Sequence, residues 1–247
     1  MFTQPTPPKK HTTESGFTIV ESLLAVIVIA IVLVGIGPII AFSAATRLQS
    51  RRIEIGIQSA RGYLSGVQSG TIADPPITET GAGDTVALKL TDVAAPTGNA
   101  LTCTNNTYCT APAPTNEASL YCIDQDNDGF CTNTSSSDLI IQAFGKQAPL
   151  GSTTTPTADQ RAEAGYQLGI RVYRANGFQS DVTLKRSSDN TSTTGPRNQA
   201  SIVTGGLGSR SLPVVEMTTE MGIDGSGGTR YEDFCKRINR TASGSCN

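Results

Sequence analysis

The chain has 247 residues, enough for one membrane-spanning helix and one soluble domain of moderate size. Its formal net charge is −2 and only 16% of its residues are charged, so no general attraction to nucleic acid is expected. Serine, threonine and glycine are plentiful, which favours an exported domain rich in strands and loops over a helical cytosolic enzyme.

The N-terminal part of the chain changes character at Phe17. Residues 1–16 are polar, proline-rich and mildly basic, whereas the run from Leu23 to Phe42 contains no polar side chain. At 1.5 Å per residue, a helix of this length spans about 30 Å, the thickness of a bilayer core. The sequence therefore predicts one membrane-spanning helix over residues 17–45.

Two residues are unusual for a plain membrane anchor. Glu21 places a carboxylate near the start of the apolar segment, where a charge costs less than the ~2.5–3.5 kcal/mol expected at mid-membrane. Pro38 lies late in the segment, where it removes a backbone donor and crowds the carbonyl of Val34. A carboxylate that snorkels to the headgroups and an ordinary helix kink would explain each residue separately.

The segment GFTIVESLL, which begins at Gly16, resembles the class III signal of type IV pilins and pseudopilins. The resemblance implies that a prepilin peptidase removes the leader, residues 1–16, by cutting between Gly16 and Phe17. The same enzyme is then expected to N-methylate the new Phe17 amine. Pro38 matches the proline common in pilin helices. The implied partners are other pilins or pseudopilins in a filament, an assembly platform in the inner membrane, and membrane lipid.

In such a filament, Glu21 of one subunit is expected to pair with the Phe17 amine of a neighbour. Methylation leaves the positive charge of that amine in place. Removing one member of a buried ion pair strands the other charge and costs several kcal/mol. The pair is therefore expected to fix the axial register of the subunits more than to add net stability.

An ordinary secretory signal peptide is the main alternative. Lys9 and Lys10 would form its basic region, and cleavage would leave a residue near Ala44 first. The apolar segment is longer than the usual run of about 7–15 residues and contains Glu21, which favours a membrane anchor. Basic residues flank the span on both sides, but the cysteines and the pilin-like signal favour an extracytoplasmic C-terminal domain. We therefore expect a single-pass inner-membrane protein that enters a cell-surface or periplasmic filament.

The helical pattern continues beyond the apolar segment, through residues 46–70. An apolar stripe at helical spacing is formed by Ile53, Ile57, Ala60, Leu64 and Val67. This stripe is expected to pack on an antiparallel sheet in the β-rich domain, residues 71–247. The predicted strands are 85–90, 118–123, 138–144, 166–174 and 181–186, with a sixth near 213–219. The expected fold class is α+β and pilin-like, with loops stapled by disulfides.

All six cysteines follow the apolar segment, as expected for disulfides in an oxidising compartment. Several connectivities are possible, and we expect nearest neighbours along the chain to pair. These pairs are Cys103–Cys109, Cys122–Cys131 and Cys235–Cys246. A zinc site is the alternative, but the spacings are wider than typical zinc spacings and no histidine follows.

The stretch DQDNDGF, which begins at Asp124, matches the start of a calcium-binding loop. Its candidate Ca²⁺ ligands are Asp124, Asp126, Asp128 and the carbonyl of Phe130. The twelfth position, normally a glutamate, is Ser135, so either Asp138 or Glu117 would have to close the site. A solvated acidic turn is the alternative interpretation.

No catalytic motif is visible, and we expect a structural subunit that is not an enzyme. The single histidine, His11, lies in the leader, and no nucleophile elbow, phosphate loop or dinucleotide fingerprint occurs. The N-terminal signal and the segments TRLQSRRIEIGIQSARGYLSGVQSG, LYCIDQDNDG and YQLGIRVYRA together resemble the pseudopilins of the cyanobacterial hormogonium polysaccharide secretion system. That resemblance implies a minor subunit in polysaccharide export and gliding motility. The alternatives are a simple bitopic or secreted domain, and a tip adhesin or DNA-uptake pilin that binds anionic ligands through the basic loop between Cys235 and Cys246.

Overall fold

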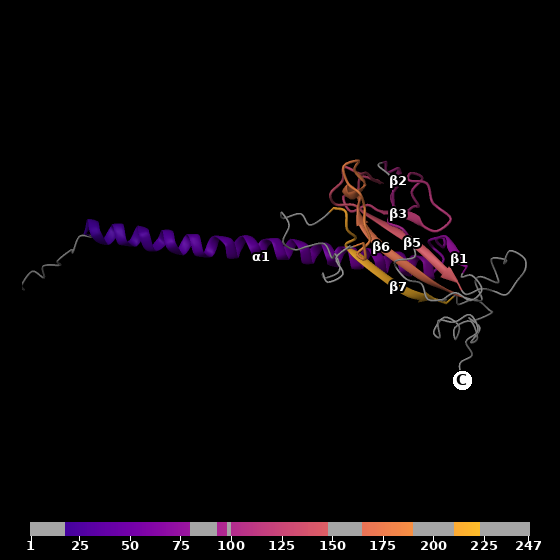
Figure 1. Cartoon of the computed structure of the whole chain (residues 1–247), viewed down its shortest axis with the longest axis horizontal. Helices are drawn as coiled ribbons and strands as arrows, with labels where there is room; N and C mark the ends of the chain where they lie inside the picture. Colours follow the sequence, from indigo (N-terminus) through magenta and orange to yellow (C-terminus); the bar gives the residue numbers. More distant parts are fainter. Residues whose placement is uncertain (1–17, 80–92, 98–99, 148–164, 190–209, 223–247) are drawn as a thin grey trace, which may run out of the picture. The chain divides into compact units, whose positions relative to one another are not determined.

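The computed structural model describes residues 18–79, 93–97, 100–147, 165–189 and 210–222 (Figure 1). The chain divides into two compact units, Met1–Arg47 and Leu48–Asn247. The predicted cleavage site at Gly16 and Phe17, the predicted strand 85–90 and the Cys235–Cys246 loop lie outside the described residues.

Helix α1 (Ile19–Gln68) accounts for 50 residues and continues through Pro38 without interruption. It begins after Thr18, whose Oγ1 accepts the N–H of Glu21 at 3.3 Å and so caps the first turn. It ends before Gly70, which has a φ of 72° and lets the chain leave the helix in the left-handed conformation. The helix predicted from the apolar periodicity is confirmed in its described part.

The second half of α1 packs on the sheet through Ala60, Leu64 and Val67, as the predicted stripe has it, but the stripe does not hold at its start. Ile53 was expected to be buried and is 38% exposed, whereas Tyr63, which the stripe omitted, is only 1% exposed. A Cβ atom at Gly56 would lie 3.1 Å from the side chains of Val214 and Val215. Because glycine lets this segment approach closely, the buried face at this end of the contact runs through Gly56, with Ile55 partly buried beside it.

The main sheet has β5 at its centre. Its strands are β1 (Ile77–Glu79), β3 (Ser119–Ile123), β5 (Leu139–Gln147), β6 (Tyr166–Arg174) and β7 (Val215–Met221). Strand β6 pairs with one side of β5 along its length (Figure 1). On the other side of β5, β3 pairs with the first part of the strand and β1 with the last part. Strand β7 pairs with β6. The β1–β5 pair is parallel and the others are antiparallel, so the sheet is mixed and the prediction of a purely antiparallel sheet was wrong.

A second, smaller sheet lies beside the first and involves the cysteines. It consists of β2 (Cys103–Thr104) and β4 (Phe130–Cys131), which pair antiparallel. Neither of these short strands nor β1 was predicted, because two or three residues carry no readable alternation. The strands predicted at 118–123, 138–144, 166–174 and 213–219 correspond to β3, β5, β6 and β7.

The strand predicted at 181–186 is absent from this described stretch. The N–H of Val182 closes a turn onto the Gln179 carbonyl at 3.0 Å. Lys185 forms single hydrogen bonds, to the Ser211 carbonyl and from the Tyr173 hydroxyl, and not a strand ladder. The apolar alternation that suggested a strand comes from Leu184, the side chain of this loop that is buried against the core, and not from sheet pairing.

Arg171 is the polar centre of the sheet face that points away from α1. It is 0% exposed and lies on β6 between its cross-strand neighbours Gln142 and Glu216. Its guanidinium donates to Gln142 Oε1 at 2.9 Å and to the carbonyls of Val93 and Ala94 at 2.9 and 3.2 Å. Its Nε lies 3.2 Å from Glu216 Oε1, an ion pair without hydrogen-bond alignment. These contacts fix the segment 93–97 on the outer face of the sheet.

Replacing Arg171 by methionine is expected to destabilise the domain. The change keeps most of the side-chain volume but removes the charged partner of Glu216 and the guanidinium donor to the Val93 carbonyl, at a cost of about 3–5 kcal/mol. Unfolding of the full chain in detergent, followed by near-ultraviolet circular dichroism, measures the loss. The control Arg61→Met removes an exposed arginine of α1 and should change stability by less than about 0.5 kcal/mol. Equal effects of the two substitutions would contradict this role for Arg171.

Candidate functional site

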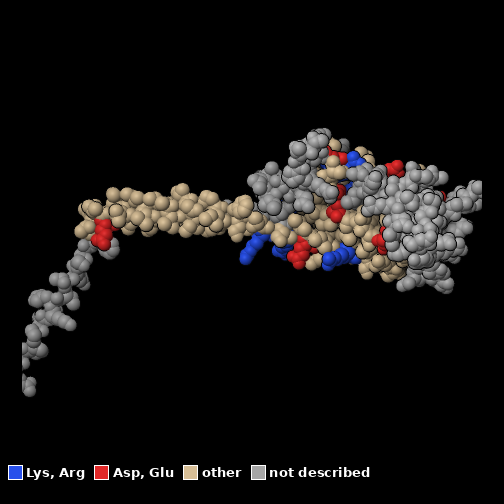
Figure 2. Space-filling view, turned by 60° about the horizontal axis from the view of Figure 1, so that its bottom comes forward, with Lys and Arg blue, Asp and Glu red and all other residues tan. Residues whose placement is uncertain are grey.

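The first candidate site is the apolar surface of α1. The stretch Ile19–Ala44 has 26 residues, a mean hydropathy of 3.1 and no buried share within the described structure. Figure 2 shows it as an uninterrupted surface of uncharged residues between one acidic patch and the first basic side chains. By length and composition this helix can cross a membrane, although a signal sequence near an N-terminus would have the same properties.

The apolar character of this helix extends around its whole circumference. Leu24, Ile29 and Val34 follow one another at steps of five residues and so point to different sides of the helix, and they are 63%, 57% and 76% exposed. A helix that is apolar on all sides is stable only where lipid or other protein surfaces cover it. This surface therefore needs an apolar environment to cover it.

Glu21 lies in the first turn of α1, where it has a local role that the sequence reasoning missed. Its N–H bonds to the Oγ1 and the carbonyl of Thr18, at 3.3 and 3.0 Å. A threonine followed three residues later by glutamate is the sequence signature of a helix N-terminus, and a carboxylate there interacts favourably with the helix dipole. The spacing of these two residues could have revealed the cap. In the described part of the chain, no ion pair involves the exposed Glu21 carboxylate.

The second candidate site is the acidic loop that follows β3. Asp124 comes directly after β3, and the loop returns into β4. The Cys122–Cys131 disulfide closes the two ends of this loop, and the Cys103–Cys109 disulfide lies beside it in the same buried cluster. Both of these predicted pairings are confirmed.

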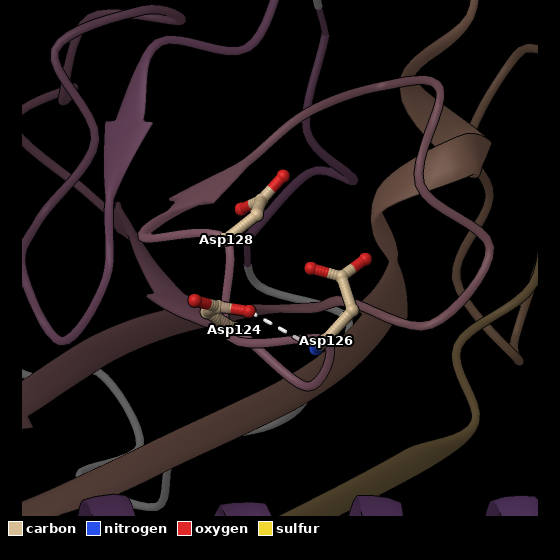
Figure 3. Close-up of side chains that lie close together, drawn as sticks. All are labelled: Asp124, Asp126 and Asp128. Atoms are coloured by element: carbon tan, nitrogen blue, oxygen red, sulfur yellow. Dashed lines mark hydrogen bonds between the residues drawn. The ribbon is translucent and has the colours of Figure 1, made fainter.

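Asp124 organises the loop from within. It is 8% exposed, and its Oδ1 accepts the N–H groups of Asp126 and Asn127 at 3.0 and 2.6 Å (Figure 3). Its Oδ2 accepts the N–H of Gly129 at 2.8 Å. Asn127 and Gly129 have positive φ values of 62° and 91°, which curl the backbone around this carboxylate. As a result, Asp124, Asp126 and Asp128 bring one oxygen each to within 4.8 Å of the others.

The two buried carboxylates of this region have opposite pKa shifts. Burial opposes ionisation of Asp124, but the backbone N–H groups of Gly129, Asn127 and Asp126 outweigh it and lower the pKa of this residue. Burial raises the pKa of Asp138, and the charges of Asp126 and Asp124 raise it further against the opposing N–H of Gln125. The backbone of the loop therefore stabilises the negative charge of Asp124, whereas the negative charge of Asp138 is poorly stabilised.

The donor set of the loop consists of oxygen atoms. The Phe130 side chain is 56% exposed at the start of β4, and its N–H donates to Asp128 Oδ1 at 2.9 Å. The Ser135 hydroxyl donates to Asp126 Oδ2 at 3.1 Å. Carboxylates, a hydroxyl and backbone carbonyls are ligands suited to a hard cation such as Ca²⁺. Glu117, the other predicted closing ligand, instead lines a separate cavity of about 200 Å³ beside Pro112–Thr115.

Asp124→Ala is expected to destabilise the metal-free protein. The substitution leaves three backbone N–H groups without their acceptor, a loss of about 1–3 kcal/mol. Unfolding in the presence of EDTA, with disulfides intact, measures this effect independently of any ion. Asp128→Ala is the matched control, because this exposed residue accepts one hydrogen bond within the loop and should cost less than about 1 kcal/mol. The internal role of Asp124 would be excluded if both variants lost the same stability.

Comparison of the chain with protein-family models, with curated proteins and with solved structures finds no match.

Proposed function

We propose that this chain is a structural subunit of a type IV pilin-like filament and has no enzymatic activity. The observation that carries the proposal is the division of α1 into two halves with different surroundings. From Ile19 to Ala44 no residue whose burial is described is covered by the described structure, whereas Ala60, Tyr63 and Val67 are buried against the sheet. Such a helix anchors a domain with one half and leaves the other half for lipid first and for neighbouring subunits later.

The N-terminal signal supports a processed precursor. The leader ending at Gly16 is cut by a prepilin peptidase, which exposes and methylates the amine of Phe17. In the filament, that amine pairs with Glu21 of an adjacent subunit, inside a core formed by the apolar helix halves. The ion pair then sets the register between subunits, because any other register leaves a charge buried without a partner.

The location and partners follow from this assembly. The subunit starts as a single-pass protein of the inner membrane with its C-terminal domain outside the cytoplasm, and an assembly platform transfers it into the filament. The disulfides fit an oxidising compartment. The resemblance of LYCIDQDNDG and YQLGIRVYRA to hormogonium pseudopilins favours a minor subunit in polysaccharide export and gliding motility.

The mature protein is expected to begin at Phe17 and to carry a methyl group on its amine. Edman sequencing and mass spectrometry of the protein from cells with an active prepilin peptidase test this. Gly16→Ile, which blocks the cut through its side-chain bulk, should leave the precursor beginning at Met1. A wild-type protein that begins near Ala44 would indicate a secreted domain with an ordinary signal peptide. A wild-type protein that still begins at Met1 would indicate a simple anchor.

Glu21→Val is expected to abolish entry into filaments while leaving membrane insertion and cleavage intact. The substitution removes the partner of the Phe17 amine but keeps the segment apolar. The amount of the subunit in the sheared filament fraction, relative to the membrane fraction, should fall at least tenfold. Glu54→Val, which alters another exposed glutamate of α1, is the control and should assemble like the wild type. Normal assembly of Glu21→Val would refute the register hypothesis.

A further inference from the structure

Asp138 is a buried carboxylate whose hydrogen bonding is incomplete. It lies immediately before β5 and is 0% exposed. Its Oδ1 accepts the N–H of Gln125 at 3.1 Å, but its Oδ2 has no hydrogen-bond partner among the described residues. Burying a carboxylate oxygen without a donor is costly, so a native fold that contains one points to a bound cation or water at that atom.

This carboxylate lies against the acidic loop. Gln125, which donates to Asp138, stands between Asp124 and Asp126 in the chain. Ser135 accepts the N–H of Asp138 at 3.2 Å and donates its hydroxyl to Asp126 Oδ2 at 3.1 Å. Asp138 is thus tied to the buried side of the same loop from which the three other carboxylates project.

The four carboxylates have no counter-ion of their own within the described ranges. The ion pairs found there involve Arg171, Arg186 and Arg210 with other acidic residues. Asp124, Asp126 and Asp128 hold one oxygen each within 4.8 Å of the others, where their negative charges repel one another. A divalent cation would relieve this repulsion and, with a small movement of Asp138, satisfy its free oxygen as well. Ca²⁺ accepts six to eight oxygen ligands at about 2.3–2.6 Å in flexible geometry, whereas Mg²⁺ demands a stricter octahedron. A curled loop whose carboxylates lie close together, with the Ser135 hydroxyl on Asp126, fits Ca²⁺ better.

We propose that residues 124–138 bind one Ca²⁺ ion through Asp124, Asp126 and Asp128, and that Asp138 is the fourth carboxylate ligand. Asp138 takes the place of the glutamate that calcium loops of this type carry at the twelfth position, where this chain has Ser135. The ion joins the end of β3, at Asp124, to the start of β5. It binds whether or not the chain enters a filament, so this proposal stands apart from the proposed function.

Calcium titration of the full chain in detergent, after removal of metal by EDTA, tests the site directly. Isothermal titration calorimetry should show one binding event with a dissociation constant on the order of 10⁻⁴ M or tighter, as for extracellular calcium modules. MgCl₂ should bind at least tenfold more weakly. Asp138→Asn and Asp126→Asn should each weaken calcium binding at least tenfold, whereas the control Glu117→Gln should bind within twofold of the wild type.

A second measurement separates a ligand from a residue that only supports the fold. The luminescence lifetime of bound Tb³⁺ in H₂O and D₂O counts the water molecules on the ion, and Asp138→Asn should add water relative to the wild type. Near-ultraviolet circular dichroism of metal-free Asp138→Asn shows whether this variant is folded. If Asp138→Asn is unfolded, Asp126→Asn, which changes an exposed residue, tests the site in its place. The absence of calcium binding by the wild type at several millimolar, or equal affinities of Asp138→Asn and Glu117→Gln, would overturn the proposal.

Discussion

Between Ile19 and Ala44 the chain carries apolar surface that no described residue covers, and this need for cover constrains everything around it. Exposing a continuous apolar helix of this length to water is unfavourable, and its length and composition are those of a helix that can cross a membrane. The first backbone N–H groups of the helix also need acceptors, and Thr18 Oγ1 accepts one of them from Glu21. The negative charge of Glu21 interacts favourably with the helix dipole at this end. One short segment therefore combines a helix start, a membrane-compatible surface and the only carboxylate of the apolar stretch.

The second half of α1 differs from the first, because the sheet of the same chain covers its apolar side chains. Tyrosines strengthen this contact: the Tyr63 hydroxyl lies 2.7 Å from that of Tyr108, which also donates to the Ala73 carbonyl at 2.6 Å. Tyr121 packs edge-on against both rings. The helix, the segment that follows it and the disulfide-bounded loops are thereby joined on one side of β3, while Arg171 holds a different segment on the other face of the sheet.

The sequence predicted the long elements well, because long elements have readable periods. Helix α1 and strands β3, β5, β6 and β7 follow from apolar spacing, and two disulfides follow from nearest-neighbour pairing. The parallel strand β1 could not be predicted, because three residues after a proline pair carry no alternation. The predicted stripe on α1 is correct at Ala60, Leu64 and Val67 but wrong at Ile53, because the close contact nearby is made by Gly56, which has no apolar side chain to recognise.

The acidic loop shows the same division between local and long-range information. Its aspartates and glycine can be read from spacing, because every hydrogen bond to Asp124 is local. The sequence alone could not decide whether Asp138 or Glu117 lies beside the acidic loop. The pairing of β3 with β5 buries Asp138 next to the loop and places Glu117 at a separate cavity. The buried row formed by Gln142, Arg171 and Glu216 was likewise invisible, because its members come from three separate strands.

The way in which α1 meets the sheet also determines how the domain bears mechanical force. Tension applied along the helix axis would have to slide Ala60, Tyr63 and Val67 across the sheet together, since all three are buried in one contact surface. Such shear loads many contacts at once, whereas peeling would break them in sequence, and the rate of forced unfolding depends on the barrier to the first rupture. The domain should therefore resist pulling through its helix better than pulling through β7, whose pairing among the described strands is with β6 alone and can be peeled away one residue pair at a time.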